Sequence, residues 1–191
     1  MARAKVADRL RLAAAAHERA AANGTDAIVV AGEAMRAALA AGKSILAFGN
    51  GGSAADAQHF VAELVVRYER ERPGRSAIAL TTDSSILTAA ANDTGYEQVF
   101  ARQIDAIGRT GDIALAISTS GTSSSVVRAL GAANARGMVT IALTGRDGGD
   151  AGKLASIHVN VPETRTAVVQ EVHTTILHVW CELIDEGLGE A

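Results

Sequence analysis

The chain has 191 residues, of which 48% are hydrophobic, so it can bury one sizeable core as a single domain. Its formal net charge of −3 gives no electrostatic footprint for nucleic acid, and its only cysteine, Cys181, excludes a disulfide framework and indicates a reducing compartment. The first 22 residues lack the apolar core of a signal peptide and no stretch approaches a membrane span, so we expect a cytoplasmic protein without membrane partners.

Two helices are expected over residues 2–41. They are separated near Asn23-Gly24, after which Thr25 or Asp26 can cap the second helix. Apolar residues recur along this N-terminal helical arm, residues 1–42. The arm either packs against a partner subunit or covers one face of a sheet, and the sequence leaves both possibilities open.

Five short apolar runs follow, and each is too short for a helix and rich in Ile, Val and Leu. They span residues 44–48, 77–80, 113–117, 139–143 and 157–161. Segments with helical spacing lie between and after them, at residues 54–67, 85–91, 96–107, 126–135 and 166–186. This alternation predicts an α/β fold, with a doubly wound, mostly parallel five-stranded sheet and helices on both faces. Residues 43–191 form the core of the single domain 1–191, and ligands should bind in loops after the carboxyl ends of strands.

A glycine-rich turn follows the first strand. Residues 49–53 read Gly-Asn-Gly-Gly-Ser and lead directly into a helix. Glycines let the backbone turn tightly and approach a ligand, and a helix start offers free N–H groups to an anion. The turn lacks the Gly-Lys-Ser/Thr of a triphosphate-binding loop and the spacing of the dinucleotide fingerprint. An anion site and a plain strand-to-helix turn both fit it.

A hydroxyl-rich loop follows the third strand. Besides Thr122, residues 118–125 contain six other serines or threonines, together with one glycine. The loop ends at a helix that is expected to begin at Val126. Hydroxyls and backbone N–H groups at a helix start can hold phosphate oxygens. Because the loop holds no lysine or arginine, a phosphate monoester suits it better than a nucleoside triphosphate. The alternative is a helix cap, although one or two hydroxyls suffice for that.

Two pairs of polar residues can carry proton transfer or bind a metal. His59 and Glu63 lie four apart on one face of the helix after the glycine turn. Such a pair is more often a surface hydrogen bond than a metal site. Gln170 and His178 lie on the last helix, separated by about 12 Å of helix rise, so one ion takes both only if each side chain reaches inward. A histidine in so apolar a helix is more often a core residue.

Three further features have structural interpretations. Asn92-Asp93 is a turn-former. The charged residues 67–75 are expected to cap a helix and to be solvated. Cys181 is expected to be a small apolar residue inside the last helix.

In combination these motifs resemble the sedoheptulose 7-phosphate isomerases, also called phosphoheptose isomerases, whose fold is the sugar isomerase (SIS) domain. The likeness runs from about residue 43 to residue 186 in unbroken order. It is carried by residues 49–53, His59 with Glu63, residues 67–68 and 72–74, Asn92-Asp93, residues 118–121, 144–145 and 148–149, and Gln170-Glu171 with His178.

The resemblance implies a homotetramer with sites between subunits, which isomerises sedoheptulose 7-phosphate to D-glycero-D-manno-heptose 7-phosphate. In family members that bind zinc, the ligand positions fall here on His59, Glu63, Gln170 and His178. The implied substrate-contact positions are Asn50, Gly51, Gly52, Ser53, Glu63, Asn92, Asp93, Ser118, Thr119, Ser120, Ser123 and Gln170. Thr122 and Ala167 depart from residues common in the family, which affects details of sugar contact.

Moving a carbonyl from C2 to C1 needs a proton taken from C1 and returned to C2. We assign Glu63 as the base and His178 as the partner acid. Two alternatives stay open: an isomerase of another sugar phosphate, and a non-catalytic relative that binds the replication initiator DnaA, which residues 80–83 and 86–89 somewhat resemble. The presence of both Glu63 and His178 favours catalysis.

Overall fold

The structure is a computed structural model that describes residues 1–188. Five strands form one sheet in the order β2-β1-β3-β4-β5, and every neighbouring pair is parallel. The strands are β1 Ile45–Gly49, β2 Ala77–Ala79, β3 Ile113–Ser118, β4 Val139–Gly145 and β5 Ile157–Val161. All residues of β1 and β3 are buried, which explains their continuous apolar sequence. The predicted five-stranded α/β fold is confirmed.

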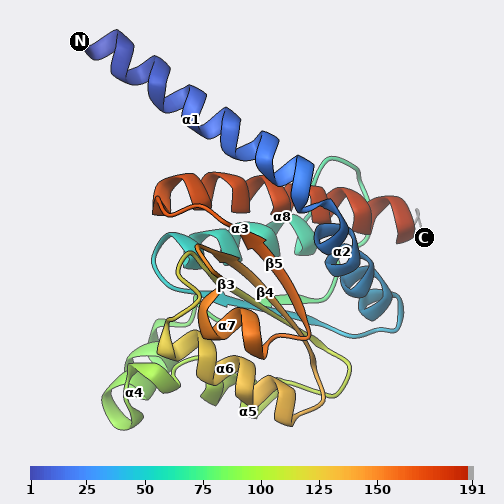
Figure 1. The fold of residues 1–191 in the computed structure, drawn as a ribbon. Helices are drawn as coiled ribbons and strands as arrows, with labels where there is room; N and C mark the ends of the chain where they lie inside the picture. Colours follow the sequence, from blue (N-terminus) through green and yellow to red (C-terminus); the bar gives the residue numbers. More distant parts are fainter. Residues whose placement is uncertain (189–191) are drawn as a thin grey trace.

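Helices cover both faces of this sheet (Figure 1). The helices are α1 Ala2–Asn23, α2 Thr25–Ala40, α3 Gly52–Val65, α4 Ser84–Thr94, α5 Ala101–Ile107, α6 Ser124–Ala135, α7 Gly149–Leu154 and α8 Thr166–Leu188, with a 3₁₀ turn η1 Tyr96–Gln98. The predicted helix 96–107 is therefore divided into η1 and α5. Helix α7 was not predicted; it is a six-residue helix that follows Gly148, whose backbone is in the left-handed region.

Each face of the sheet has its own hydrophobic core. Helices α1, α2, α3 and α8 lie on one face, and α4 to α7 lie on the other (Figure 1). On the first face, Trp180 of α8 packs edge-on against Phe60 of α3, with ring centroids 6.2 Å apart. On the second face, Phe48 of β1 lies 5.5 Å from Phe100. The site residues on α3 and α8 are thus supported by one of two separate cores.

The N-terminal arm divides into a packed part and a projecting part. Helix α2 buries Met35 and Ala31 in the first core, so this half covers the sheet face. The first half of α1 extends away from the body of the molecule (Figure 1), and Leu10 is 67% exposed. The predicted capping of α2 by Thr25 or Asp26 is wrong: both residues lie inside the helix, and Gly24 is its N-cap.

Two other interpretations from the sequence are corrected, and one is confirmed. Asn92-Asp93 does not form a turn, because both residues lie in the last turn of α4. The charged segment after α3 is not wholly solvated, since the Arg72 side chain is only 3% exposed. Cys181 is a buried core residue, and burial raises the pKa of its thiol to about 12. Within residues 1–188, no helix is both long and apolar enough to cross a membrane.

Candidate functional site

The glycine turn brings the backbone close to other elements at the carboxyl end of β1. Gly51, the N-cap of α3, has φ of +59°, a conformation that favours glycine. A Cβ on Gly49 would lie 2.6 Å from the Ile117 carbonyl oxygen of β3. A Cβ on Gly52 would lie 2.1 Å from Nε2 of Gln170 on α8, so this side chain lies directly against the turn. The structure therefore brings the predicted substrate position Gln170 to the glycine turn.

The hydroxyl loop lies at the carboxyl end of the neighbouring strand β3. Ser118 is buried, and its Oγ accepts a hydrogen bond from the Gly121 amide at 3.1 Å. The Oγ of Ser120 accepts from the Thr122 amide at 3.3 Å. Ser123 is the N-cap of α6, and its side chain makes no capping hydrogen bond within the described residues. Its hydroxyl and the α6 N-terminus can therefore serve an anion rather than the helix.

A hydrogen-bond chain joins these two loops. Asn50 Nδ2 donates to Ser125 Oγ at 3.0 Å, and Asn50 Oδ1 accepts from the Tyr96 hydroxyl at 2.8 Å. Both ends of the Asn50 amide are thus fixed, one by the hydroxyl loop and one by η1. Pairing of β1 with β3 places Gly49 opposite Ile117, which explains why the two loops meet.

The loop after β4 closes around the hydroxyl loop. A Cβ on Gly121, which has φ of +67°, would lie 1.9 Å from the Gly148 carbonyl oxygen. The Ala151 amide donates to the Gly121 carbonyl at 2.9 Å. The hydroxyl loop is therefore held from behind by backbone contacts, which pre-organises its donors.

Helices α3 and α8 lie side by side and run in the same direction. Gln170 lies against Gly52, Thr174 donates to Asp56 at 3.1 Å, and the Nε2 atoms of His178 and His59 lie 2.7 Å apart. Contacts that advance along both helices together require a parallel pair. One imidazole of the histidine pair donates to the other, so the two rings meet without an intervening group.

Glu63 lies one turn beyond His59 on the same face of α3. Its Oε1 is 3.6 Å from Nδ1 of His59, too long for a hydrogen bond but close enough for an ion pair when the ring is protonated. The Glu63 side chain is 22% exposed and that of His59 is 42% exposed, so both can meet a ligand. The structure thus brings together three of the predicted metal or catalytic residues: His59, Glu63 and His178.

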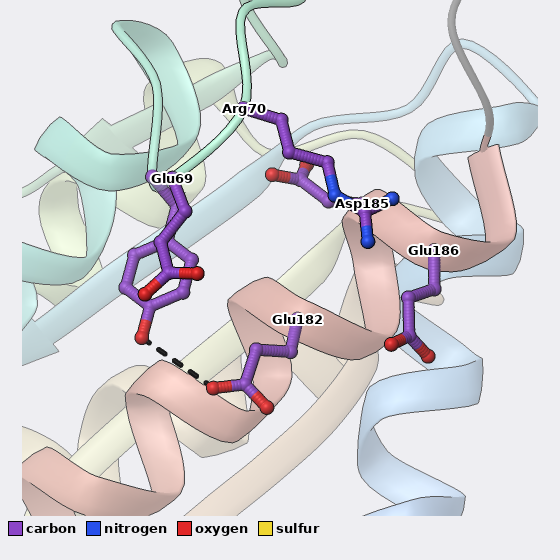
Figure 2. Close-up of a pocket in the computed structure, with 6 residues that line it drawn as sticks. Glu69, Arg70, Glu182, Asp185 and Glu186 are labelled. Carbon is purple, nitrogen blue, oxygen red and sulfur yellow. Dashed lines mark hydrogen bonds between the residues drawn. The ribbon is translucent and has the colours of Figure 1, made fainter.

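Other groups line the neighbourhood of this histidine pair. The ring of Tyr68 lies 5.5 Å from that of His178, and its hydroxyl donates to Glu182 at 3.5 Å. Tyr68 lines a pocket of about 320 Å³ between the loop after α3 and the end of α8 (Figure 2). Asp56 is half-buried beside His59, and desolvation raises the pKa of its carboxyl despite the Thr174 hydrogen bond.

A sequence profile decides the family. The profile of the SIS domain matches residues 10–145. The chain belongs to the SIS domain family. Within it, the phosphoheptose isomerase of Halorhodospira halophila is 58% identical over 164 residues, covering 84% of this chain and 83% of that relative. The phosphoheptose isomerase of Alkalilimnicola ehrlichii is 54% identical over 167 residues, covering 86% and 85%. The predicted family is confirmed.

Solved structures agree with this SIS-domain assignment. Phosphoheptose isomerase GmhA from Neisseria gonorrhoeae has a TM-score of 0.92 and 43% identity, covering 97% of this chain and 100% of that chain. A phosphoheptose isomerase from Francisella tularensis has a TM-score of 0.94 and 37% identity, covering 97% and 99%. The fold on which we place the site is therefore the fold of these relatives.

In this SIS-domain chain, not every predicted site residue reaches the others. Asn92 donates to Asp93 at 2.8 Å, and both are exposed on α4. Among residues 1–188, no group of three or more His, Cys, Asp or Glu side chains has an arrangement that could hold a metal ion. Tyr96, which orients Asn50, was missed because a single tyrosine after a glycine carries no motif.

Proposed function

We propose that this chain isomerises sedoheptulose 7-phosphate to D-glycero-D-manno-heptose 7-phosphate. The observation that carries the proposal is the contact between His59 and His178 beside Glu63, on the same chain as a hydroxyl loop without lysine or arginine. Relatives 52–58% identical are named phosphoheptose isomerase. The substrate carries its phosphate at C7 and reacts at C1 and C2, so it needs an anion site and a separate acid/base site.

The hydroxyl loop is proposed to hold the phosphate. Ser118, Ser120 and Ser123 offer neutral donors at the α6 N-terminus, where the helix dipole favours an anion. The glycine turn, with Asn50 fixed at both ends, would contact the sugar through side chain and backbone.

The acid/base step is proposed to use Glu63 and His178. The Glu63 carboxylate removes a proton from C1, the electrons of that C–H bond form the enediol, and C2 receives a proton as the carbonyl forms at C1. The His178 imidazole donates a proton to the C2 oxygen as the enediol forms, and it accepts the proton of the C1 hydroxyl as the carbonyl forms at C1. The partial exposure of Glu63 leaves its carboxylate accessible to the substrate.

Zinc is proposed as the cofactor because of the donor set. Two imidazole nitrogens, a carboxylate and an amide oxygen suit this borderline ion, and His59 and His178 already point their Nε2 atoms at each other. In the structure the two imidazoles contact each other directly and do not form a ready-made metal site, so they would have to move apart for His59, Glu63 and His178 to hold the ion, with Gln170 as a fourth ligand. Bound there, zinc would act as a Lewis acid on substrate oxygens. Elemental analysis of protein purified without chelator tests this, and absence of stoichiometric zinc would refute it.

We also propose that the chain assembles as a homotetramer with sites between subunits. We propose the cytoplasm as its location. The projecting half of α1, with Val6 59% and Leu10 67% exposed, supports an arm that packs on a neighbour. Removing the residues before Ala27 should weaken assembly and activity together, as measured by light scattering and turnover. Mixing an inactive Glu63→Gln chain with an inactive hydroxyl-loop variant should restore activity, and no recovery would argue against shared sites.

The deciding experiment incubates purified protein with sedoheptulose 7-phosphate and follows aldose formation by NMR, with and without chelator. Glu63→Gln and His178→Ala should each abolish turnover while circular dichroism stays unchanged, because they remove proton-transfer groups rather than core volume. The exposed pair Lys153 and Asp150, away from the N-terminal arm, offers a control, since Lys153→Ala should leave turnover unchanged. A Glu63→Gln chain with near-normal kcat would remove Glu63 from the mechanism.

A further inference from the structure

Arg72 lies in the loop after α3 and is buried despite its charge. Only 3% of its side chain is exposed, and the partner Asp185 on α8 is 7% exposed. Taking two charges out of water is unfavourable unless the geometry satisfies both groups. The contacts of the buried Arg72 guanidinium therefore indicate which parts of the structure it stabilises.

The guanidinium of Arg72 bonds to both helices of the candidate site. Its Nε donates to Asp185 Oδ1 at 2.8 Å, its Nη2 donates to the carbonyl oxygen of Glu63 at 2.7 Å, and its Nη1 donates to that of Leu64 at 2.7 Å. Carbonyls in the last turn of a helix have no partners within the helix. Arg72 therefore caps the C-terminus of α3 and ties that end to α8.

The surrounding loop leaves this clamp little freedom. The Arg75 amide donates to the same Leu64 carbonyl at 2.9 Å. A Cβ on Gly74 would lie 2.6 Å from the Val65 carbonyl oxygen, so the loop passes directly over the end of α3. The planar fork of an arginine matches two adjacent carbonyls and a carboxylate, whereas a lysine ammonium is a point charge on a flexible stem.

We propose that Arg72 is a positioning residue for the isomerisation, an inference that rests on the proposed function. One of its bonds is to the main chain of Glu63, the proposed base, and another is to a residue two turns beyond His178, the proposed acid. Arg72 thereby fixes how α3 and α8 lie against each other, and with them the separation of base and acid. A shift of about 1 Å between such groups can lower a rate by about a hundredfold.

The matched control is Arg136, which makes the same kind of contact away from the site. Its guanidinium pairs with Asp105 at 3.4 Å and donates to the Gly108 carbonyl at 3.3 Å, at the C-terminal end of α5 on the other face of the sheet. Arg72→Lys, Asp185→Asn and Arg136→Lys should be compared for kcat, KM and the side-chain ¹⁵N signals of His59 and His178. Asp185→Asn keeps the size of the side chain and serves if Arg72→Lys does not fold.

The expected result is a fall in kcat between about tenfold and about a hundredfold for Arg72→Lys, with KM changed by less than about threefold. The His59 and His178 signals should shift in Arg72→Lys and Asp185→Asn and stay in place in Arg136→Lys. If the wild-type chain does not convert sedoheptulose 7-phosphate, the proposed function fails, and the histidine signals still test the clamp. A folded Arg72→Lys chain with unchanged histidine signals, or with kcat within about twofold of wild type, would overturn the inference.

Discussion

Replacing Gly52 by alanine separates the chemistry of the site from its stability. A Cβ at this position would lie 2.1 Å from Nε2 and 2.9 Å from Cδ of Gln170. These atoms are the end of a flexible side chain, so Gln170 should rotate away while the backbone of α3 stays in place. The substitution thus removes the Gln170 amide from the glycine turn without altering Gln170 itself.

Gly52→Ala should affect stability and activity differently. Gly52 is the first residue of α3 and has no left-handed backbone, and alanine in a helix is more stable than glycine by up to about 1 kcal/mol. Moving the Gln170 side chain to another rotamer offsets part of this gain, so unfolding free energy should change by less than about 1 kcal/mol. Loss of one polar contact to the substrate costs about 1–3 kcal/mol, which is roughly a 5- to 150-fold fall in kcat/KM.

The assay combines steady-state turnover of sedoheptulose 7-phosphate with urea unfolding of the same samples. Gly131→Ala in α6 is the control, because a Cβ there finds only Leu154 Cδ2, at 3.9 Å. It should gain similar stability and keep full activity. If Gly52→Ala has wild-type kcat/KM, the position of Gln170 against the turn does not matter for catalysis. If it unfolds, the overlap is not relieved by rotation of Gln170.

Three further substitutions probe other parts of the site. Gly121→Ala should lower the unfolding free energy by several kcal/mol, as measured by urea unfolding. The left-handed φ disfavours alanine, and the new Cβ would lie 1.9 Å from the Gly148 carbonyl oxygen, so the backbone cannot relieve both the strain and the clash. A loss below about 1 kcal/mol would contradict this. Tyr96→Phe should lower kcat/KM by about fivefold, since Asn50 loses a hydrogen bond worth about 1 kcal/mol, and unchanged kinetics would show that Asn50 needs no such support. Burial lowers the pKa of His173 from 6.5 to about 4. Between these two pH values the His173 ring is protonated in the unfolded chain but not in the folded chain. Stability should fall by roughly 3 kcal/mol as pH drops from 6.5 to 4, and His173→Leu should flatten that slope in urea unfolding; an equal slope in both chains would be the contrary result.

Buried strands were predictable because both of their faces are covered, which leaves a continuous apolar signal in β1 and β3. Helix α7 was not predictable, because six residues with two glycines carry too little periodicity. Arg72 was misread because a charged segment is usually solvated, and its burial depends on Asp185, 113 residues away. Local patterns cannot report partners at such separation.

The arrangement of the site follows from the strand order, which the sequence does not contain. The chain passes from β1 outward to β2 and then returns to the other side of β1 to form β3. Right-handed crossovers then place α3 on one face of the sheet and α4 to α7 on the opposite face. The glycine turn after β1 and the hydroxyl loop after β3 meet at this reversal, where open α/β sheets bind ligands.

Within residues 1–188, helix α8 does not connect two strands, so the crossover rule does not place it. Its position depends on its own apolar face, including Trp180, which packs on Phe60 and donates to the Ile28 carbonyl of α2 at 2.9 Å. The contact of His59 with His178 spans 119 residues and exists only because this packing sets α8 parallel to α3. The candidate site residues could therefore be predicted from the sequence motifs. Their proximity in the fold depends on the hydrophobic interface between α3 and α8 and on the contacts of Arg72 at the C-terminal ends of these two helices.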